Sequence, residues 1–204
     1  MISILDYGSG NINAIRNIYE RLNIPSELIS SVGEIEKAER VILPGVGAFD
    51  ETISTLREKG IVDILNRRVE KGNLLILGIC VGMQMLADCS EEGSLAGLGW
   101  IPGEVKKFDK NLIQGKPKLP HLGWNSISIV KDCPLFKGID EEIGFYFVHS
   151  YYFNCKYVEN VLTTTDYGIT FHSAISRGNV YGVQFHPEKS HDNGIQLLRN
   201  FAEL

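Results

Sequence analysis

The fold of this chain is decided in the stretch Leu74–Gln84, LLILGICVGMQ. Its first part, Leu74–Ile79, is an apolar run of the length expected for a strand buried in a sheet. A short helical stretch is expected from Gly82 onward, so the chain must turn sharply at Cys80. Such a turn pushes its central side chain beyond the sheet edge, and it directs the first free N–H groups of the helix at whatever that side chain attacks.

A second segment far downstream, Phe185-His186-Pro187-Glu188, supplies partners for this cysteine. His186 can accept and return a proton. Glu188 stands two residues further along what is expected to be a strand-like segment, so it would point the same way and orient the imidazole. Nucleophile, base and orienting carboxylate are therefore all present. The two segments predict an enzyme that cleaves an acyl bond through a thioester.

Each of these residues also has a purely structural explanation. A lone cysteine after an apolar run is most often buried in the core, and a lone histidine or glutamate is often an ordinary core or surface residue. The glycines on both sides of Cys80 favour the catalytic interpretation, because a core cysteine does not require a tight turn around it.

Length and composition predict the class of protein. The chain has 204 residues with 44% hydrophobic and 22% charged residues, which suits one α/β domain over residues 1–204. A net charge of −5 argues against nucleic-acid binding as the main task. The apolar run Leu74–Met83 is too short to span a membrane. Met1–Leu5 is followed by Asp6 and preceded by no basic residue, so no export signal is expected.

The cysteines and histidines predict no metal site and no disulfide scaffold. Four cysteines occur without a C-x-x-C spacing, and the histidines outside the His186 segment lack paired metal-ligand spacing. Free thiols suit a reducing compartment. We therefore expect a soluble cytoplasmic protein without metal or cofactor.

The order of the expected elements predicts an α/β fold with a mostly parallel central sheet, helices on both faces, and an antiparallel strand layer in the C-terminal half. Strands and helices alternate over the first half: Ile2–Leu5, Ile12–Leu22, Ser26–Ile29, Val41–Leu43, Asp50–Arg57, Ile61–Glu70 and Leu74–Ile79. The second half contains seven short strand-like runs before a closing helix: Trp100–Val105, Asn125–Val130, Gly144–Val148, Tyr151–Asn154, Val161–Thr165, Ala174–Ser176, Val180–Gln184 and Gly194–Leu204.

Three glycine-rich or functional loops should meet at one edge of this sheet, because ligands of parallel sheets bind beyond the carboxyl ends of the strands. These are Asp6–Asn11 after the first strand, Pro44–Gly47, and the turn at Cys80. Asn11 is also a suitable N-cap for the helix that follows it.

Three motifs carry a family resemblance over essentially the whole chain. They are Pro44–Phe49 (PGVGAF), Gly78–Gln84 (GICVGMQ) and Gly182–Ser190 (GVQFHPEKS), with support from Pro120–Asn125 (PHLGWN) and Tyr146–Tyr151 (YFVHSY). With them the chain resembles the class I (triad) glutamine amidotransferases. Within that group it is most similar to the glutaminase subunits of imidazole glycerol phosphate synthases.

The resemblance implies a role for each matching position. Cys80 would attack the amide carbon of L-glutamine, and His186, held by Glu188, would move the proton. The oxyanion hole would use the N–H of Val81 and one from the Pro44–Gly47 loop, at Val46 or Gly47. Three further positions would line the glutamine pocket: Gln84, Ser150 and Tyr151. A partner that docks at the same sheet edge would have Asn11 and Trp124 as candidate contacts, because a large aromatic residue suits an interface anchor; a buried core position is the alternative for Trp124.

The resemblance also implies a partner and a pathway. The ammonia would pass through the interface of a heterodimer to a (β/α)8-barrel cyclase, which forms imidazole glycerol phosphate in histidine biosynthesis. Trp100 departs from the aliphatic residue of many such subunits, and with Cys80-Val81 it is similar to paralogues that supply ammonia for amidation of bacterial surface sugars. A stand-alone γ-glutamyl cysteine hydrolase and a non-catalytic scaffold subunit are further alternatives, although the intact triad disfavours the scaffold.

Overall fold

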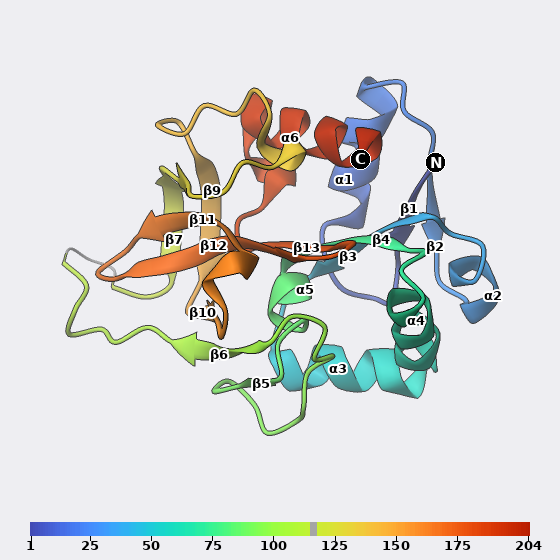
Figure 1. Ribbon diagram of the computed structural model, residues 1–204, viewed down its shortest axis with the longest axis horizontal. Coiled ribbons are helices and arrows are strands. Elements are labelled where there is room, and N and C mark those ends of the chain that lie inside the picture. Colours follow the sequence, from blue (N-terminus) through green and yellow to red (C-terminus); the bar gives the residue numbers. More distant parts are fainter. Residues whose placement is uncertain (115–117) are drawn as a thin grey trace.

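The computed structural model describes residues 1–114 and 118–204. Its centre is a twisted sheet with the strand order β2-β1-β3-β4-β13-β12-β10-β6-β5 (Figure 1). The first five strands in this order run parallel to one another. They are β2 (Ser26–Ile29), β1 (Ile2–Leu5), β3 (Arg40–Gly45), β4 (Leu75–Cys80) and β13 (Val180–Val183).

Helices cover both faces of this parallel part. In Figure 1, α1 (Ile12–Arg21) and α6 (His191–Glu203) lie together above the sheet, and α3 (Phe49–Glu58) and α4 (Ile61–Glu70) lie below it. Two shorter helices are α2 (Val32–Ile35) and α5 (Val81–Gln84). The helices are amphipathic and bury one stripe each, as Ile15, Ile18 and Tyr19 do on α1. No helix among the described residues is long and apolar enough to cross a membrane.

The C-terminal half adds antiparallel strands to the parallel part, as the sequence predicted, and most of them extend the central sheet. From β13 the sheet continues through β12 (Thr170–Arg177), β10 (Tyr151–Cys155) and β6 (Gly103–Lys107) to the two-residue β5 (Cys89–Ser90). Off this path lie β11 (Val161–Asp166) and β8 (Ser128–Ile129). A separate two-stranded sheet is formed by β7 (His121–Asn125) and β9 (Phe145–His149). Short 3₁₀ turns follow at Pro134–Phe136, Val158–Asn160 and Pro187–Lys189.

Strand boundaries in this half differ from those expected because pairing partners decide where a strand lies. The run Trp100–Val105 was expected to be a strand, but β6 begins at Gly103 and continues to Lys107, where each residue pairs with one of β10. The expected strand Asn125–Val130 is split between the end of β7 and β8. Hydrophobicity alone therefore located these strands to within a few residues.

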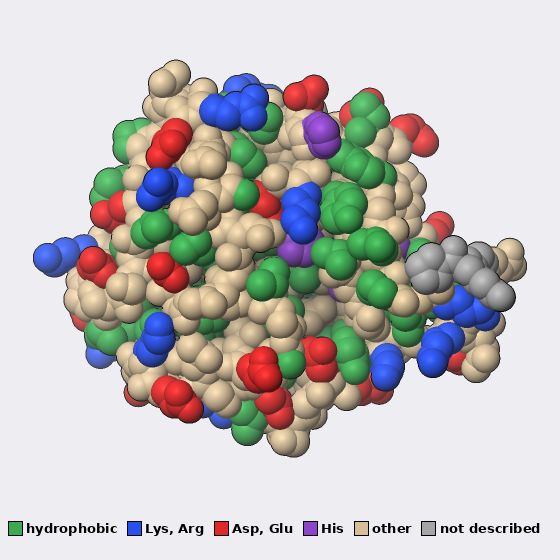
Figure 2. Space-filling view, turned by 180° about the vertical axis from the view of Figure 1, so that it is seen from behind, with side chains coloured by type: hydrophobic (Ala, Val, Ile, Leu, Met, Phe, Trp, Pro, Cys, Tyr) green, Lys and Arg blue, Asp and Glu red, His purple; other side chains and the backbone are tan. Residues whose placement is uncertain are grey.

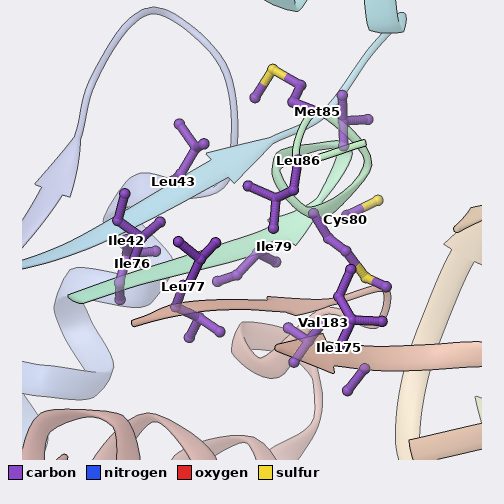
Figure 3. Close-up of a cluster of buried hydrophobic side chains, with 14 of the residues drawn as sticks. Ile42, Leu43, Ile76, Leu77, Ile79, Cys80, Met85, Leu86, Ile175 and Val183 are labelled. Atoms are coloured by element: carbon purple, nitrogen blue, oxygen red, sulfur yellow. The ribbon is translucent and has the colours of Figure 1, made fainter. Parts of the chain in front are cut away.

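The central strand β4 lies in the middle of the hydrophobic core, and its residues from Ile76 to Cys80 are buried. Figure 3 shows Cys80 at the carboxyl end of this strand, beyond Ile79. In the same view Leu86 and Val183 lie on either side of the strand. A rigid, fully packed strand thus ends at the side chain that the sequence singles out.

Candidate active site

Cys80 stands in a strained turn between β4 and α5, with φ 56° and ψ −111°. A non-glycine residue at positive φ is costly and persists only where its surroundings impose it. The flanking glycines allow the turn to pack: a Cβ on Gly82 would lie 1.9 Å from the carbonyl oxygen of Leu43, and one on Gly78 would lie 2.5 Å from that of Gly82. The elbow predicted from the sequence is confirmed. Its glycines are required not only by the local turn but also because a side chain at either position would collide with neighbouring backbone atoms.

His186 and Glu188 form a buried pair whose side chains are each 2% exposed. Nδ1 of His186 lies 2.8 Å from Oε1 of Glu188. His186 is extended, but the segment that follows it, Pro187–Lys189, is a 3₁₀ turn and not the strand that the sequence predicted, so the two side chains meet across the start of this turn. Nε2 of His186 is buried and has no hydrogen-bond partner among the described residues. It is therefore available to a reacting group.

Burial and charge act in opposite directions on this pair. Burial disfavours the charged form of His186, but its interactions with Cys80 and Glu188 are stronger and raise the pKa of the imidazole. Burial likewise disfavours the Glu188 carboxylate, but the hydrogen bond from His186 and that from Asn11 hold its pKa below the usual range. The arrangement favours a protonated imidazole bound to a carboxylate.

The loop between β1 and α1 contacts both the Pro44–Gly47 loop and the carboxylate. The Tyr7 hydroxyl donates to the carbonyl of Pro44. The Ser9 hydroxyl donates to the carbonyl of Val46 over 2.7 Å and accepts from the Val46 N–H over 3.0 Å. Together with the pairing of Gly45 beside Cys80, these contacts confirm that the three loops meet at one sheet edge.

Asn11 occupies the N-cap position of α1, as expected, but its side chain makes no capping bond. Its amide instead donates to Oε1 of Glu188 over 2.8 Å. The triad carboxylate thus accepts from two side chains that are 175 residues apart in the chain (11 and 186). This contact does not follow from sequence spacing.

A cavity of about 390 Å³ opens beside Cys80. It is lined by nine of the residues singled out in the sequence, namely Asn11, Val46, Gly47, Cys80, Val81, Gln84, Ser150, Tyr151 and His186. Glu188 lies behind His186, and Trp124 lies outside the cavity with 44% of its surface exposed. Figure 2 shows one face of the molecule, where histidine side chains lie in a hollow among hydrophobic ones. The volume suits a small molecule.

Four further residues line the cavity that sequence reasoning did not identify: Glu92, Val148, His149 and Lys189. Of these four, Glu92 also contacts a helix. One of its oxygens accepts a hydrogen bond from the N–H of Phe49, at the start of α3, over 3.0 Å. Burial raises the pKa of its carboxyl. No motif surrounds Glu92, and only the folding of the segment after β5 brings it to the cavity.

His121 and His149 stand 28 residues apart in the chain and have no paired spacing in the sequence. The register of β7 and β9 places them opposite each other, with Nδ1 of His121 3.0 Å from Nε2 of His149. Burial lowers the pKa of both rings, to about 4 for His121 and about 3 for His149. Among the described residues no group of three metal-ligating side chains occurs.

Comparisons with known proteins show the family to which this chain is similar. The sequence profile of the family "Glutamine amidotransferase class-I" matches residues 3–204. Proteins named imidazole glycerol phosphate synthase subunit HisH are similar over the full length of both chains: 49% identity for that of Bdellovibrio bacteriovorus and 45% for that of Leptospira interrogans.

Solved structures share the fold at low sequence identity. PurLQS from Thermotoga maritima superposes with a TM-score of 0.75 at 16% identity, covering 99% of this chain and 97% of that one. A crystal structure titled glutamine amidotransferase gives a TM-score of 0.73 at 21% identity, covering 100% of this chain and 99% of that one. These likenesses establish the arrangement of the strands and helices.

Proposed function

The chain belongs to the class I glutamine amidotransferases, and from this premise we propose that it hydrolyses L-glutamine and delivers the ammonia to a synthase partner. The observation that carries the proposal is the convergence of Cys80 and His186 at one cavity, with Glu188 bound to the imidazole and the other imidazole nitrogen buried without a partner among the described residues. The similarity to HisH subunits supports imidazole glycerol phosphate synthase, in histidine biosynthesis, as the assembly in which the chain works.

In the proposed reaction, the Cys80 thiolate attacks the side-chain amide carbon of glutamine and forms a carbon–sulfur bond. His186, as the imidazolium, donates its Nε2 proton to the departing nitrogen, and ammonia leaves. Water then attacks the thioester carbonyl while His186 accepts one of its protons. The carbon–sulfur bond breaks, and glutamate and the Cys80 thiolate are released. Glu188 orients the ring throughout.

Each tetrahedral intermediate carries an oxyanion that needs hydrogen-bond donors. We propose the N–H of Val81, the first residue of α5, as one donor. The second would come from Val46 or Gly47, which line the same cavity. In the partner-free chain the Val46 N–H is already engaged by Ser9, so this loop is the natural point of control.

The rest of the cavity supplies groups for the amino-acid end of glutamine. We propose that Gln84, Ser150 and Tyr151 line the substrate, as the family resemblance implies. Glu92 adds a carboxylate at the same cavity, and its second oxygen has no hydrogen bond to another described residue. A carboxylate in a half-buried site is well suited to bind the α-ammonium group.

Replacing Glu92 with Gln is expected to raise KM for glutamine by about tenfold to a hundredfold and to change kcat less. The reason is that binding of an ammonium group by a carboxylate contributes to substrate and transition state alike. Steady-state glutamate formation measures both constants. Glu91→Gln, which changes the exposed neighbour, is the matched control. An unchanged KM in the Glu92 variant would remove this residue from the substrate site.

We propose that the partner, a (β/α)8-barrel cyclase, docks beside the mouth of the cavity. The outer face of β7 carries Leu122 and Trp124, which are 54% and 44% exposed. Across the pair, Leu122 stands opposite Val148, which lines the cavity. An exposed tryptophan on an apolar face is typical of an interface anchor. Because this face is continuous with the cavity, a docked partner would receive ammonia without exposing it to water.

The proposed activity is tested by covalent labelling with a diazoketone analogue of glutamine. We expect modification of Cys80 alone among the four cysteines, located by peptide mass spectrometry, and protection by excess L-glutamine. The analogue must enter the substrate cavity to react, so the exposed Cys89 serves as an internal control for nonspecific alkylation. Labelling of Cys89 without Cys80 would contradict the proposal.

A cytoplasmic location for the whole chain, as one domain over residues 1–204, is part of the same proposal. The four cysteines are free thiols, and a catalytic thiolate persists best in a reducing compartment.

A further inference from the structure

A chain of buried hydrogen bonds ends on the sulfur of Cys80. Gln184 directly follows β13 and is completely buried. Its Nε2 donates to Sγ of Cys80 over 3.6 Å, and its Oε1 accepts from Nε2 of Gln84 over 3.0 Å. Gln184 does not line the cavity, so it approaches the sulfur from inside the protein.

The direction of these bonds follows from a backbone carbonyl. The two ends of a side-chain amide have nearly the same shape, and only the hydrogen-bond network distinguishes them. Gln84 contacts the carbonyl oxygen of Tyr151 over 3.0 Å. A carbonyl can only accept, so the nitrogen of Gln84 faces it. The same nitrogen reaches Gln184, which must present its oxygen there and its N–H to Cys80.

The two buried histidines hold the other side of that carbonyl. Nδ1 of His149 donates to the Tyr151 oxygen over 2.7 Å. Nε2 of His149 is then an acceptor and receives the proton on Nδ1 of His121 over 3.0 Å. Nε2 of His121 accepts in turn from the amide of Asn125 over 3.2 Å. If both histidine rings are neutral, each hydrogen bond in this network has one donor and one acceptor. The Tyr151 carbonyl that orients Gln84 is therefore itself held in place.

We propose that Gln184 is a further catalytic residue, whose carboxamide donates a hydrogen bond to the sulfur of Cys80 and stabilises the thiolate. A buried N–H needs a partner, and a bond to a charged acceptor is stronger than one to a neutral acceptor. The donor therefore favours the ionised form of Cys80 before substrate arrives. The inference rests on the proposed function, in which that thiolate is the nucleophile.

The test compares Gln184→Met and Gln184→Glu with the parent. Methionine keeps the length of the side chain and removes the donor. Glutamate still accepts from Gln84 but places a carboxylate at the sulfur. The rate of alkylation by iodoacetamide is measured against pH for each cysteine by mass spectrometry. Only thiolates react, and the exposed Cys89 is the reference within each molecule. Gln196→Met, on α6, is the matched control.

In Gln184→Met we expect alkylation of Cys80 at neutral pH to be about tenfold slower than in the parent, approaching the parent's rate only at higher pH. In Gln184→Glu the pH profile of Cys80 alkylation should be shifted further toward high pH, because a carboxylate then lies beside the sulfur. Cys89 and the Gln196 variant should be unchanged. If Gln184→Met does not fold, Gln184→Glu still tests the proposal, since the glutamate side chain preserves the shape of the amide.

An unchanged pH profile of Cys80 in folded variants, even with reduced turnover, would overturn the inference and leave Gln184 a structural role. Failure of the proposed function is distinguishable, because it would appear in the parent itself as a Cys80 that the glutamine analogue does not label.

Discussion

Replacement of Cys80 with Ala is expected to reduce glutamine hydrolysis to background, a loss approaching the order of 10⁶-fold. The sulfur is the atom that forms the thioester, and no other cysteine lines the described cavity. Stability should be nearly unchanged or slightly higher, because removing the small side chain leaves the glycine-dependent packing of the turn intact. Glutamate and ammonia release measure the activity, and thermal unfolding measures the stability.

The other three cysteines are the controls. Changing Cys89, Cys133 or Cys155 to Ala should leave turnover within about tenfold of the parent, a barrier change of about 1.4 kcal/mol. Cys89 is exposed and the other two are buried away from the cavity, so a small loss of stability is expected only for Cys133 and Cys155. A Cys80→Ser variant that releases ammonia at the parent's rate would disprove the assignment of the nucleophile.

The second large effect is expected from the partner. Ammonia released into water is protonated and lost to the acceptor, so turnover should be low until a ligand-loaded partner docks. We expect docking to raise glutamine hydrolysis by about 10²–10³-fold, the effect of one oxyanion donor. The measurement is ammonia release by the chain alone, with the barrel partner, and with partner plus acceptor ligand. Equal rates in all three would favour a stand-alone hydrolase.

A substitution at Ser9 tests the effect of the Pro44–Gly47 loop on turnover separately from the effect of the partner. Its hydroxyl contacts both the N–H and the carbonyl of Val46, and Gly47 on the far side has a φ of 111° that allows the peptide to turn. Ser9→Ala should therefore raise the rate of the free chain and reduce the ratio of stimulated to basal turnover. A variant with the parent's basal rate and ratio would show that this contact does not control the oxyanion hole.

The elbow at Cys80 could be predicted from the local sequence. The apolar run, the single cysteine and its two glycines are contiguous, and the local chain geometry they require is the same in any parallel sheet. The sequence therefore predicted Cys80 at the end of a buried strand. It also predicted the meeting of the three loops, because the carboxyl ends of parallel strands share one edge.

Glu188 illustrates a correct contact predicted for a wrong reason. The i to i+2 spacing was taken as strand periodicity, but Pro187 begins a 3₁₀ turn. Proline pre-sets a φ that suits the first position of such a turn. The side chains of His186 and Glu188 still meet, because the turn, with Asn11 on its far side, holds the carboxylate against the ring.

The sequence by itself thus determined the fold class and the nucleophilic turn, since these depend on short-range geometry and on the periodicity of apolar residues. The other cavity residues that it named followed from the family resemblance. Only the tertiary structure decided that Asn11 binds Glu188, that Glu92 enters the cavity, that His121 pairs with His149, and that Gln184 donates to Cys80. Each of these contacts joins residues that are distant in the chain, and strand register and buried hydrogen-bond satisfaction select them. Both are properties of the packed molecule, and no local pattern encodes them.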